Sequence, residues 1–133
     1  MDDLHPMLLM DKTELRLAKK LIRQIDRENK REQASSQLAD LNAAVLEREI
    51  GLKKYMVIRV ERDDGLTTQL QALSFSISYF RGYIDGWWDV SGRNIRKNGT
   101  IGLRDEGLSF RNARISRRLL DGSWVKLGLR RDK

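Results

Sequence analysis

The chain changes character abruptly near residue 54. Residues 11–54 contain one glycine and no proline, and they are rich in Leu, Ala, Glu, Lys, Arg and Gln, which are good helix formers. From Tyr55 onward, aromatic and β-branched residues recur in short alternating runs that turn signals separate. This switch predicts an α+β protein. A helical arm or helical hairpin over residues 1–54 precedes a small antiparallel β domain over residues 55–133.

The helical half carries two apolar stripes that point in roughly opposite directions when the chain is wound at about 100° per residue. The first stripe contains Leu15, Ala18, Leu21, Ile22 and Ile25, and the second contains Leu38, Leu41, Val45 and Leu52. A break at Ala34–Ser36, with Ser35 or Ser36 as a new N-cap, would let both stripes be buried. We therefore expect helices at about 12–32 and 36–52. The alternative is one long helix that packs on a partner chain at one end and on its own β domain at the other.

Turn signals divide the second half into short strands. Asp63-Asp64-Gly65 predicts a hairpin turn, and alternating apolar and serine residues predict a strand over residues 73–80. The remaining strands are expected near residues 56–61, 66–72, 83–91, 100–104, 108–118 and 123–131. Six or seven antiparallel strands suffice for a curled sheet or a small barrel. Residues 66–84 also fit a helix.

Positive charge is concentrated in the last third of the chain. The net charge is +7 and the pI is about 10.0. Residues 92–133 carry 12 basic and 4 acidic side chains, against 3 and 5 in residues 55–91 and 11 and 10 in residues 1–54. This balance favours polyanionic partners, with nucleic acid first and an anionic membrane surface second.

Arginine dominates that basic third, and its planar guanidinium matches phosphate oxygens. These residues fall into three expected groups. A loop flanked by Gly and Asn is expected to contain Arg93, Arg96 and Lys97, and one long strand is expected to contain Arg111, Arg114, Arg117 and Arg118. The tail contains Arg130, Arg131 and Lys133. Along a strand, Arg111 and Arg117 would share one face while Arg114 and Arg118 share the other. The competing interpretation is a set of solvated arginines that protect a sheet edge from aggregation.

The first helix carries a second basic feature. Eight cations fall within an arc of about 120° on the side away from the apolar stripe: Lys12, Arg16, Lys19, Lys20, Arg23, Arg27, Lys30 and Arg31. Such a stripe can follow a phosphate backbone or lie on an anionic membrane. It is also what the solvent face of an amphipathic packing helix looks like.

Trp87 and Trp88 are adjacent, so a strand would direct one ring inward and the other outward. We expect the inward ring in the core. The outward ring can stack on a base, or it can pack against a neighbouring element.

Catalytic and metal-binding patterns are weak. The chain has no cysteine, and its one histidine, His5, lies near the N-terminus. Asp85 and Asp89 would share a strand face and could pair around Mg²⁺, but the sequence offers no third ligand. Phosphate-loop and dinucleotide-binding motifs are missing from the sequence. We expect a non-catalytic protein that needs no cofactor or metal.

The only apolar run near the start, Met7–Met10, is too short for a secretory signal or a membrane span, so a cytoplasmic location is expected.

Together these patterns predict a nucleic-acid-binding protein that contacts the phosphate backbone with little sequence preference, for DNA or RNA. The helical arm is expected to mediate homo-oligomer formation or to dock a protein partner. One alternative is a structural or assembly subunit of a virion, secretion apparatus or ribonucleoprotein. A third possibility is a small regulator that blocks another protein's nucleic-acid site.

Overall fold

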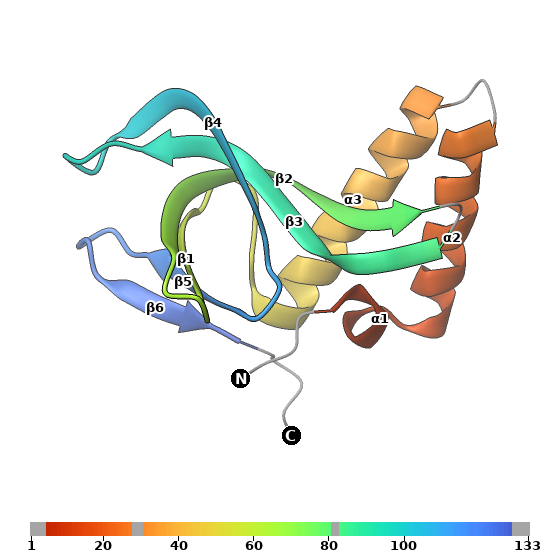
Figure 1. Ribbon diagram of the computed structural model, residues 1–133, viewed down its shortest axis with the longest axis horizontal. Coiled ribbons are helices and arrows are strands. Elements are labelled where there is room, and N and C mark those ends of the chain that lie inside the picture. The colour runs from red at the N-terminus through yellow and green to blue at the C-terminus, as the bar shows by residue number, and fades with distance from the viewer. Residues whose placement is uncertain (1–4, 28–30, 81–82, 129–133) are drawn as a thin grey trace.

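Three helices come first along the chain and six strands follow (Figure 1). The computed structural model describes residues 5–27, 31–80 and 83–128. The helices are α1 (Pro6–Leu9), α2 (Lys12–Arg27) and α3 (Arg31–Ile50). The strands are β1 (Val57–Arg62), β2 (Thr67–Phe80), β3 (Tyr83–Ile95), β4 (Ile101–Ser109), β5 (Ala113–Arg118) and β6 (Trp124–Leu127). The predicted α+β class is confirmed.

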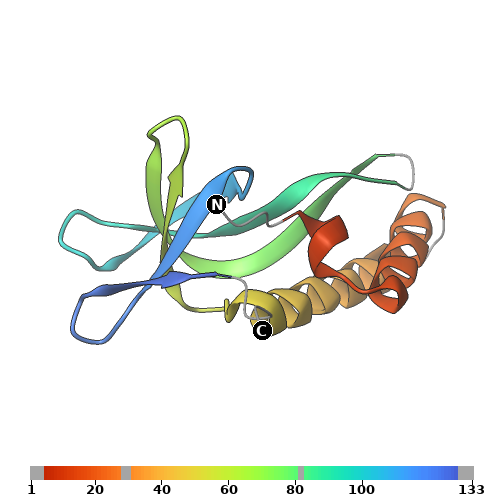
Figure 2. The same ribbon diagram turned by 90° about the horizontal axis from the view of Figure 1, so that it is seen from below.

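The six strands form one antiparallel sheet in the order β4-β3-β2-β1-β5-β6. The edge strands β4 and β6 do not pair with each other in the described chain, so the sheet is open and the barrel alternative is wrong. In both views, the β3–β4 turn and the β5–β6 turn lie at the end of the molecule farthest from α2 (Figures 1 and 2). The curl of the sheet thus brings two turns from distant parts of the sequence toward each other.

Several strand boundaries differ from the prediction. β2 is one continuous strand, and an irregularity in its register between Ala72 and Ser74 falls where two strands were expected. Residues 66–84 are therefore not helical within their described part. The strands expected at 100–104 and 108–118 left a turn at Asp105-Glu106-Gly107, but these residues lie inside β4, where Gly107 pairs with Ser91. The predicted strand over 108–118 is instead divided by a turn that contains Asn112 at φ 50°, a left-handed conformation that asparagine tolerates.

Helices α2 and α3 pack against each other as an antiparallel hairpin (Figure 1). α3 already begins at Arg31 and continues through the predicted break at Ala34–Ser36, so both that break and the single long helix are wrong. The physical reason is packing, because Ala34 is buried in the core. The two exposed serines that follow it lower helix stability by only about a few tenths of a kcal/mol each. The helical hairpin that was one of the two predicted forms is confirmed.

One cluster of buried side chains joins the helices to the sheet. Leu21 and Leu46 from the helices meet Ile58, Trp88 and Ile115 from the strands in this core. The predicted apolar stripes of α2 and α3 are thus largely buried within their own chain. The Asn42 side-chain amide also donates to the Phe75 carbonyl (3.0 Å), which ties α3 to β2.

Arg48 of α3 holds the three helices together. Its guanidinium donates to both carboxylate oxygens of Glu14 in α2 (2.6 and 2.9 Å) and to the Leu9 carbonyl of α1 (3.1 Å). A further bond reaches Glu49 on the same helix (2.8 Å). The hydrogen bonds to Glu14 and then Glu49 raise the pKa of Arg48 above its ordinary value. The Arg48 guanidinium is therefore positively charged at every accessible pH.

No helix in the described part of the chain is both long and apolar enough to cross a membrane.

Candidate anion-binding site

The basic residues of the last third do not form one patch. Arg93 lies within β3, opposite Asp105 of β4, and its guanidinium reaches the Leu103 carbonyl (3.4 Å). It therefore belongs to the sheet and not to the predicted loop. Arg96 and Lys97 are exposed at the β3–β4 turn, as their Gly/Asn context predicts. Arg130, Arg131 and Lys133 lie outside the described residues.

Arg111 lies in the turn between β4 and β5, whereas Arg117 lies within β5. The predicted sharing of one strand face by these two residues is therefore wrong. The Arg111 guanidinium lies over the Trp87 ring (5.1 Å), and Arg111 shares a surface depression with Asp63 and Asp64. Arg114 is exposed on β5 but stands opposite Glu61 of β1. Nearby carboxylates thus dilute the positive charge at both positions.

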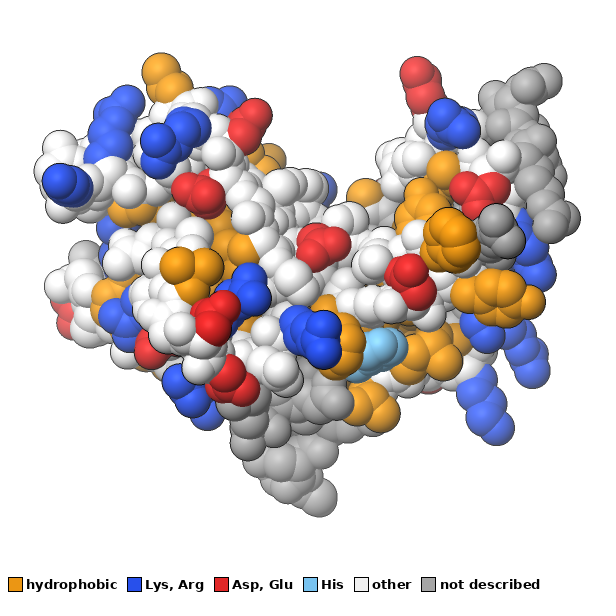
Figure 3. Space-filling view, in the orientation of Figure 1, with side chains coloured by type: hydrophobic (Ala, Val, Ile, Leu, Met, Phe, Trp, Pro, Cys, Tyr) orange, Lys and Arg blue, Asp and Glu red, His pale blue; other side chains and the backbone are white. Residues whose placement is uncertain are grey.

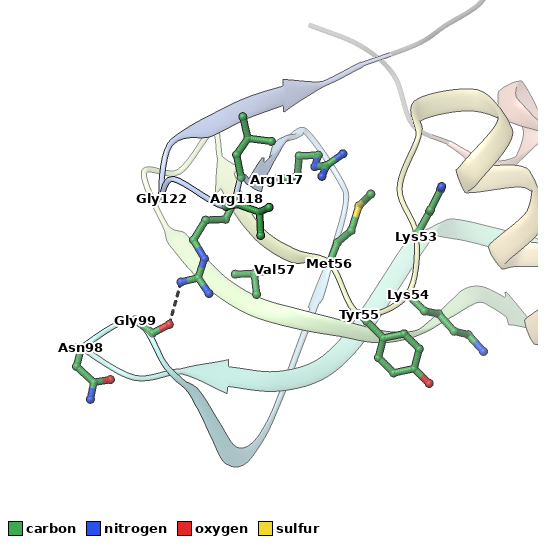
Figure 4. Close-up of a pocket in the computed structure, with 12 residues that line it drawn as sticks. Lys53, Lys54, Tyr55, Met56, Val57, Asn98, Gly99, Arg117, Arg118 and Gly122 are labelled. Carbon is green, nitrogen blue, oxygen red and sulfur yellow. Dashed lines mark hydrogen bonds between the residues drawn. The ribbon is translucent and has the colours of Figure 1, made fainter.

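Arg117 and Arg118, in contrast, line an open pocket of about 650 Å³ at the end of β5 (Figure 4). Three other segments complete its wall: the connection from α3 to β1 with Lys53 and Lys54, the β3–β4 turn, and the β5–β6 turn. We call this site the basic pocket. Among the residues that the structure describes, its lining contains four cations and no carboxylate.

One interaction closes the wall between two of these segments. The Arg118 Nη1 donates to the Gly99 carbonyl (2.8 Å), which joins the end of β5 to the β3–β4 turn (Figure 4). Arg117 forms no ion pair within 4.0 Å in the described ranges, and its Nε is buried without a hydrogen-bond partner there. Met56 and Val57 add an apolar part to the same wall. The pocket thus combines two exposed lysines with two partly buried arginines, and an anion is attracted more strongly beside the partly buried pair than in bulk water.

Asp121 is the acid closest in sequence to residues of the pocket lining. Its neighbours Leu120 and Gly122 line the pocket, but Asp121 itself does not. Its carboxylate accepts hydrogen bonds from the hydroxyl (2.6 Å) and the backbone N–H (2.9 Å) of Ser123. These bonds lower the pKa of Asp121 below its ordinary value. The Asp121 carboxylate therefore stabilises the β5–β6 turn through its hydrogen bonds to Ser123.

Tyr55 lines the pocket from a left-handed backbone conformation, with φ at 74°. Its N–H donates to the Ala72 carbonyl (2.6 Å), and its carbonyl accepts from the Gln71 side chain (3.3 Å). The segment starts where Gly51, at φ 77°, ends α3 in an αL cap, with its N–H donating to the Glu47 carbonyl (3.0 Å). The Tyr55 side chain is 69% exposed.

Sequence reasoning missed Lys53, Lys54 and Tyr55 because they lie at the boundary between the helical and strand patterns. The available signal was two lysines and an aromatic residue directly after the glycine that ends a helix. That signal does not say which other residues will face them. Only the pairing of β1 with β5 brings this segment beside Arg117 and Arg118.

Trp87 and Trp88 divide as the alternation predicts. Trp88 is fully buried in the core, and Trp87 is partly exposed. The Trp87 ring meets His5 edge-on (4.7 Å) and Arg111 over its face. The histidine side chain is visible, in pale blue, on the face of the molecule that Figure 3 shows. Neither tryptophan lines the basic pocket, and Trp87 packs α1 and the β4–β5 turn against β3.

The basic stripe on α2 is a separate surface. Lys12, Arg16, Lys20 and Arg23 are exposed, and Lys19 is partly buried. These five cations form no ion pair within 4.0 Å with any residue that the structure describes. Exposed Arg31 begins α3, whereas Lys30 and the side chain of Arg27 lie outside what is described. Basic side chains project from the α2 edge (Figure 3), at the opposite end of the long axis from the two turns of the basic pocket (Figure 1).

No group of three His, Asp or Glu side chains within residues 5–27, 31–80 and 83–128 is arranged to hold a metal ion. Asp85 accepts a hydrogen bond from the Ser78 hydroxyl (2.7 Å), and Asp89 is partly buried, which raises its pKa. The chemistry that the basic pocket offers is the binding of an anion.

Comparison of the chain with protein-family models, curated proteins and solved structures finds no match. The geometry of the basic pocket is therefore the basis on which a function can be assigned.

Proposed function

We propose that the protein binds nucleic acid through the phosphate backbone, with little sequence specificity, and that the basic pocket is the binding site. One observation carries this proposal. Lys53, Lys54, Arg117 and Arg118 come from two segments far apart in the sequence, yet they line one pocket whose described lining contains no carboxylate.

Such a pocket has the chemistry that a phosphate group requires. Arginine offers a planar set of donors to phosphate oxygens, and lysine adds a mobile point charge. Each neutralised phosphate releases condensed counterions, and this release supplies most of the affinity of non-specific binding. Arg96 and Lys97, exposed at the adjoining β3–β4 turn, extend the positive charge beyond the pocket. No step of this binding requires a base edge, which is why little sequence preference follows.

The test is a salt titration of binding to fluorescent DNA and RNA oligonucleotides, followed by anisotropy. The informative variant is Lys53→Gln/Lys54→Gln, because both side chains are exposed and neither has a hydrogen bond to break in the described chain. Losing two phosphate contacts lowers affinity by about tenfold near physiological salt and reduces the slope of log K against log salt by about 1.4 for single strands.

The matched control is Arg104→Gln/Lys126→Gln, which removes the same charge from exposed positions on β4 and β6. Equal losses from the two double variants would reduce the pocket to a contributor of net charge and overturn the proposal. So would a Kd no tighter than about 10⁻⁴ M for every oligonucleotide at physiological salt. An absence of binding by a folded protein would favour the role of a structural or assembly subunit.

Self-association through the helices remains a prediction. Since the apolar stripes of α2 and α3 are already buried in the core of their own chain, a homo-oligomer would have to use other surfaces. Light scattering at high protein concentration measures this directly.

A further inference from the structure

We propose that the basic pocket selects single-stranded over duplex nucleic acid, and that Tyr55 is the platform on which a base stacks. This inference rests on the proposed function, and it adds the class of nucleic acid that the same site accepts.

The conformation and exposure of Tyr55 carry the inference. A residue with a side chain pays free energy to adopt a positive φ, and such strain persists only where the surroundings enforce it. Here the bonds to Ala72 and Gln71 fix the backbone. Burial of the ring does not offset the strain, because the side chain is 69% exposed. The segment therefore holds an aromatic ring in water at the wall of a cationic pocket.

An exposed ring beside cations is the combination that single-stranded nucleic acid requires. Every base has a flat face that stacks on an aromatic side chain, while the backbone follows the positive charge. In a duplex, the base faces are covered by their neighbours in the stack, so Tyr55 would gain nothing from a duplex.

The shape of the site supports the same choice. Arg117 and Arg118 are partly buried, and the bond from Arg118 to Gly99 holds the two walls together. The open pocket has a volume of about 650 Å³, within the size range of sites for small ligands. A flexible strand can turn a phosphate into such a pocket, whereas a rigid double helix reaches mainly the exposed side chains around it.

The experiment compares the binding of oligothymidylate and of a blunt DNA duplex to the full chain carrying Tyr55→Phe, Tyr55→Ala or Tyr55→Gly. Tyr55→Phe keeps the ring, so affinity for the single strand should stay within twofold of the parent. Tyr55→Ala should lose about fivefold to one-hundredfold in single-strand affinity, because stacking of a base is lost, with duplex affinity unchanged within twofold.

Tyr55→Gly separates stacking from folding. Glycine adopts φ 74° without strain, so this variant should melt no lower than Tyr55→Ala while losing the same single-strand affinity. A second readout is photo-crosslinking of an oligonucleotide that contains 5-iodouracil, with Tyr55 expected as the modified residue by mass spectrometry.

The outcomes distinguish the two proposals. If Tyr55→Gly and Tyr55→Ala bind oligothymidylate like the parent, or if the duplex binds as tightly as the single strand, the present inference fails. The proposed function would still stand in that case, provided that Lys53→Gln/Lys54→Gln weakens binding. If no oligonucleotide binds the parent protein, both proposals fail.

Discussion

The basic stripe on α2 and the basic pocket both concentrate positive charge, but they are built in different ways. The stripe comes from successive turns of one helix, and its described cations, from Lys12 to Arg23, are spread over about 17 Å of the helix surface. The pocket draws its cations from two distant segments, and a hydrogen bond between Arg118 and Gly99 joins its walls. Only the pocket places its cations around one common cavity.

The difference shows that the number of basic residues in a stretch of sequence does not predict whether the fold gathers them around one cavity. The stripe has five described cations without an ion pair, yet each of them faces bulk water or borders it, where attraction is weak and screened. The pocket has only four, but two of them are partly buried. A shared cavity, and not the number of cations, favours the pocket as the proposed binding site.

The largest expected effect tests how far the pocket depends on packing. Ile58 is fully buried in β1, directly opposite Arg117 of β5. Ile58→Ala should lower the free energy of unfolding by about 2–4 kcal/mol, because it leaves a cavity under the strand pair that builds the pocket. Urea denaturation measures the loss. Ile101→Ala, at a 40% exposed position on β4, is the control and should cost less than about 1 kcal/mol. Similar costs for the two variants would contradict this account of the pocket.

The next effect concerns the attachment of the stripe. Glu14→Gln removes the charge that α2 presents to Arg48 and should lower the free energy of unfolding by about 0.5–1 kcal/mol, since the pair is partly exposed. Thermal unfolding followed by circular dichroism measures this change, with Asp26→Asn, exposed on the same helix, as the control. Oligonucleotide affinity should stay within twofold. A tenfold loss of affinity would mean that the stripe and the pocket act as one surface.

A smaller effect compares the two surfaces directly. Lys12→Gln/Lys20→Gln removes two exposed charges from the stripe. Affinity for a single strand should fall by less than about threefold at physiological salt, because screening operates over about 8 Å and the stripe lies at the other end of the molecule. Anisotropy under the conditions used for Lys53→Gln/Lys54→Gln provides the comparison. A loss as large as that of the pocket variant would reverse the ranking of the two surfaces.

The smallest effect lies on β3, away from both surfaces. Burial raises the pKa of Asp89, so between its unfolded and its folded pKa the folded state binds more protons than the unfolded state. Stability from this group is therefore present at acid pH and is lost as the pH rises through the folded pKa. Asp89→Asn should raise the melting temperature slightly at neutral pH and leave it unchanged at acid pH below both pKa values. A lower melting temperature at neutral pH would show that the carboxylate has a favourable partner.

The parts of the fold that could be predicted are those with a local cause. Helix-forming composition predicted the helical half, and strict alternation predicted the direction of the two tryptophan rings. The position of the helix break could not be predicted, because tertiary packing of Ala34 outweighs the capping preference of the serines that follow it. The turn between β4 and β5 was missed for a similar reason, since Asn112 lacks the glycine that usually marks such a turn.

The candidate site was only half predictable. Arg117 and Arg118 stand out as a pair of arginines in a strand pattern, but nothing local distinguishes them from Arg111 and Arg114. The structure separates these pairs through strand register and through the acids that face each of them. Lys53, Lys54 and Tyr55 become part of the site only through a long-range strand pairing.

The strand order also has a consequence for the order in which the two surfaces can arise during folding. β2, β3 and β4 each pair with the strand before them along the chain, so they can form as successive hairpins. The pairing of β1 with β5 skips three strands and must close the longest loop in the sheet, which makes it the slowest to assemble. The basic pocket spans that seam, whereas the basic stripe needs only one helix. The pocket therefore depends on the pairing with the largest sequence separation in the sheet, whereas the cations of the stripe are brought together within one helix.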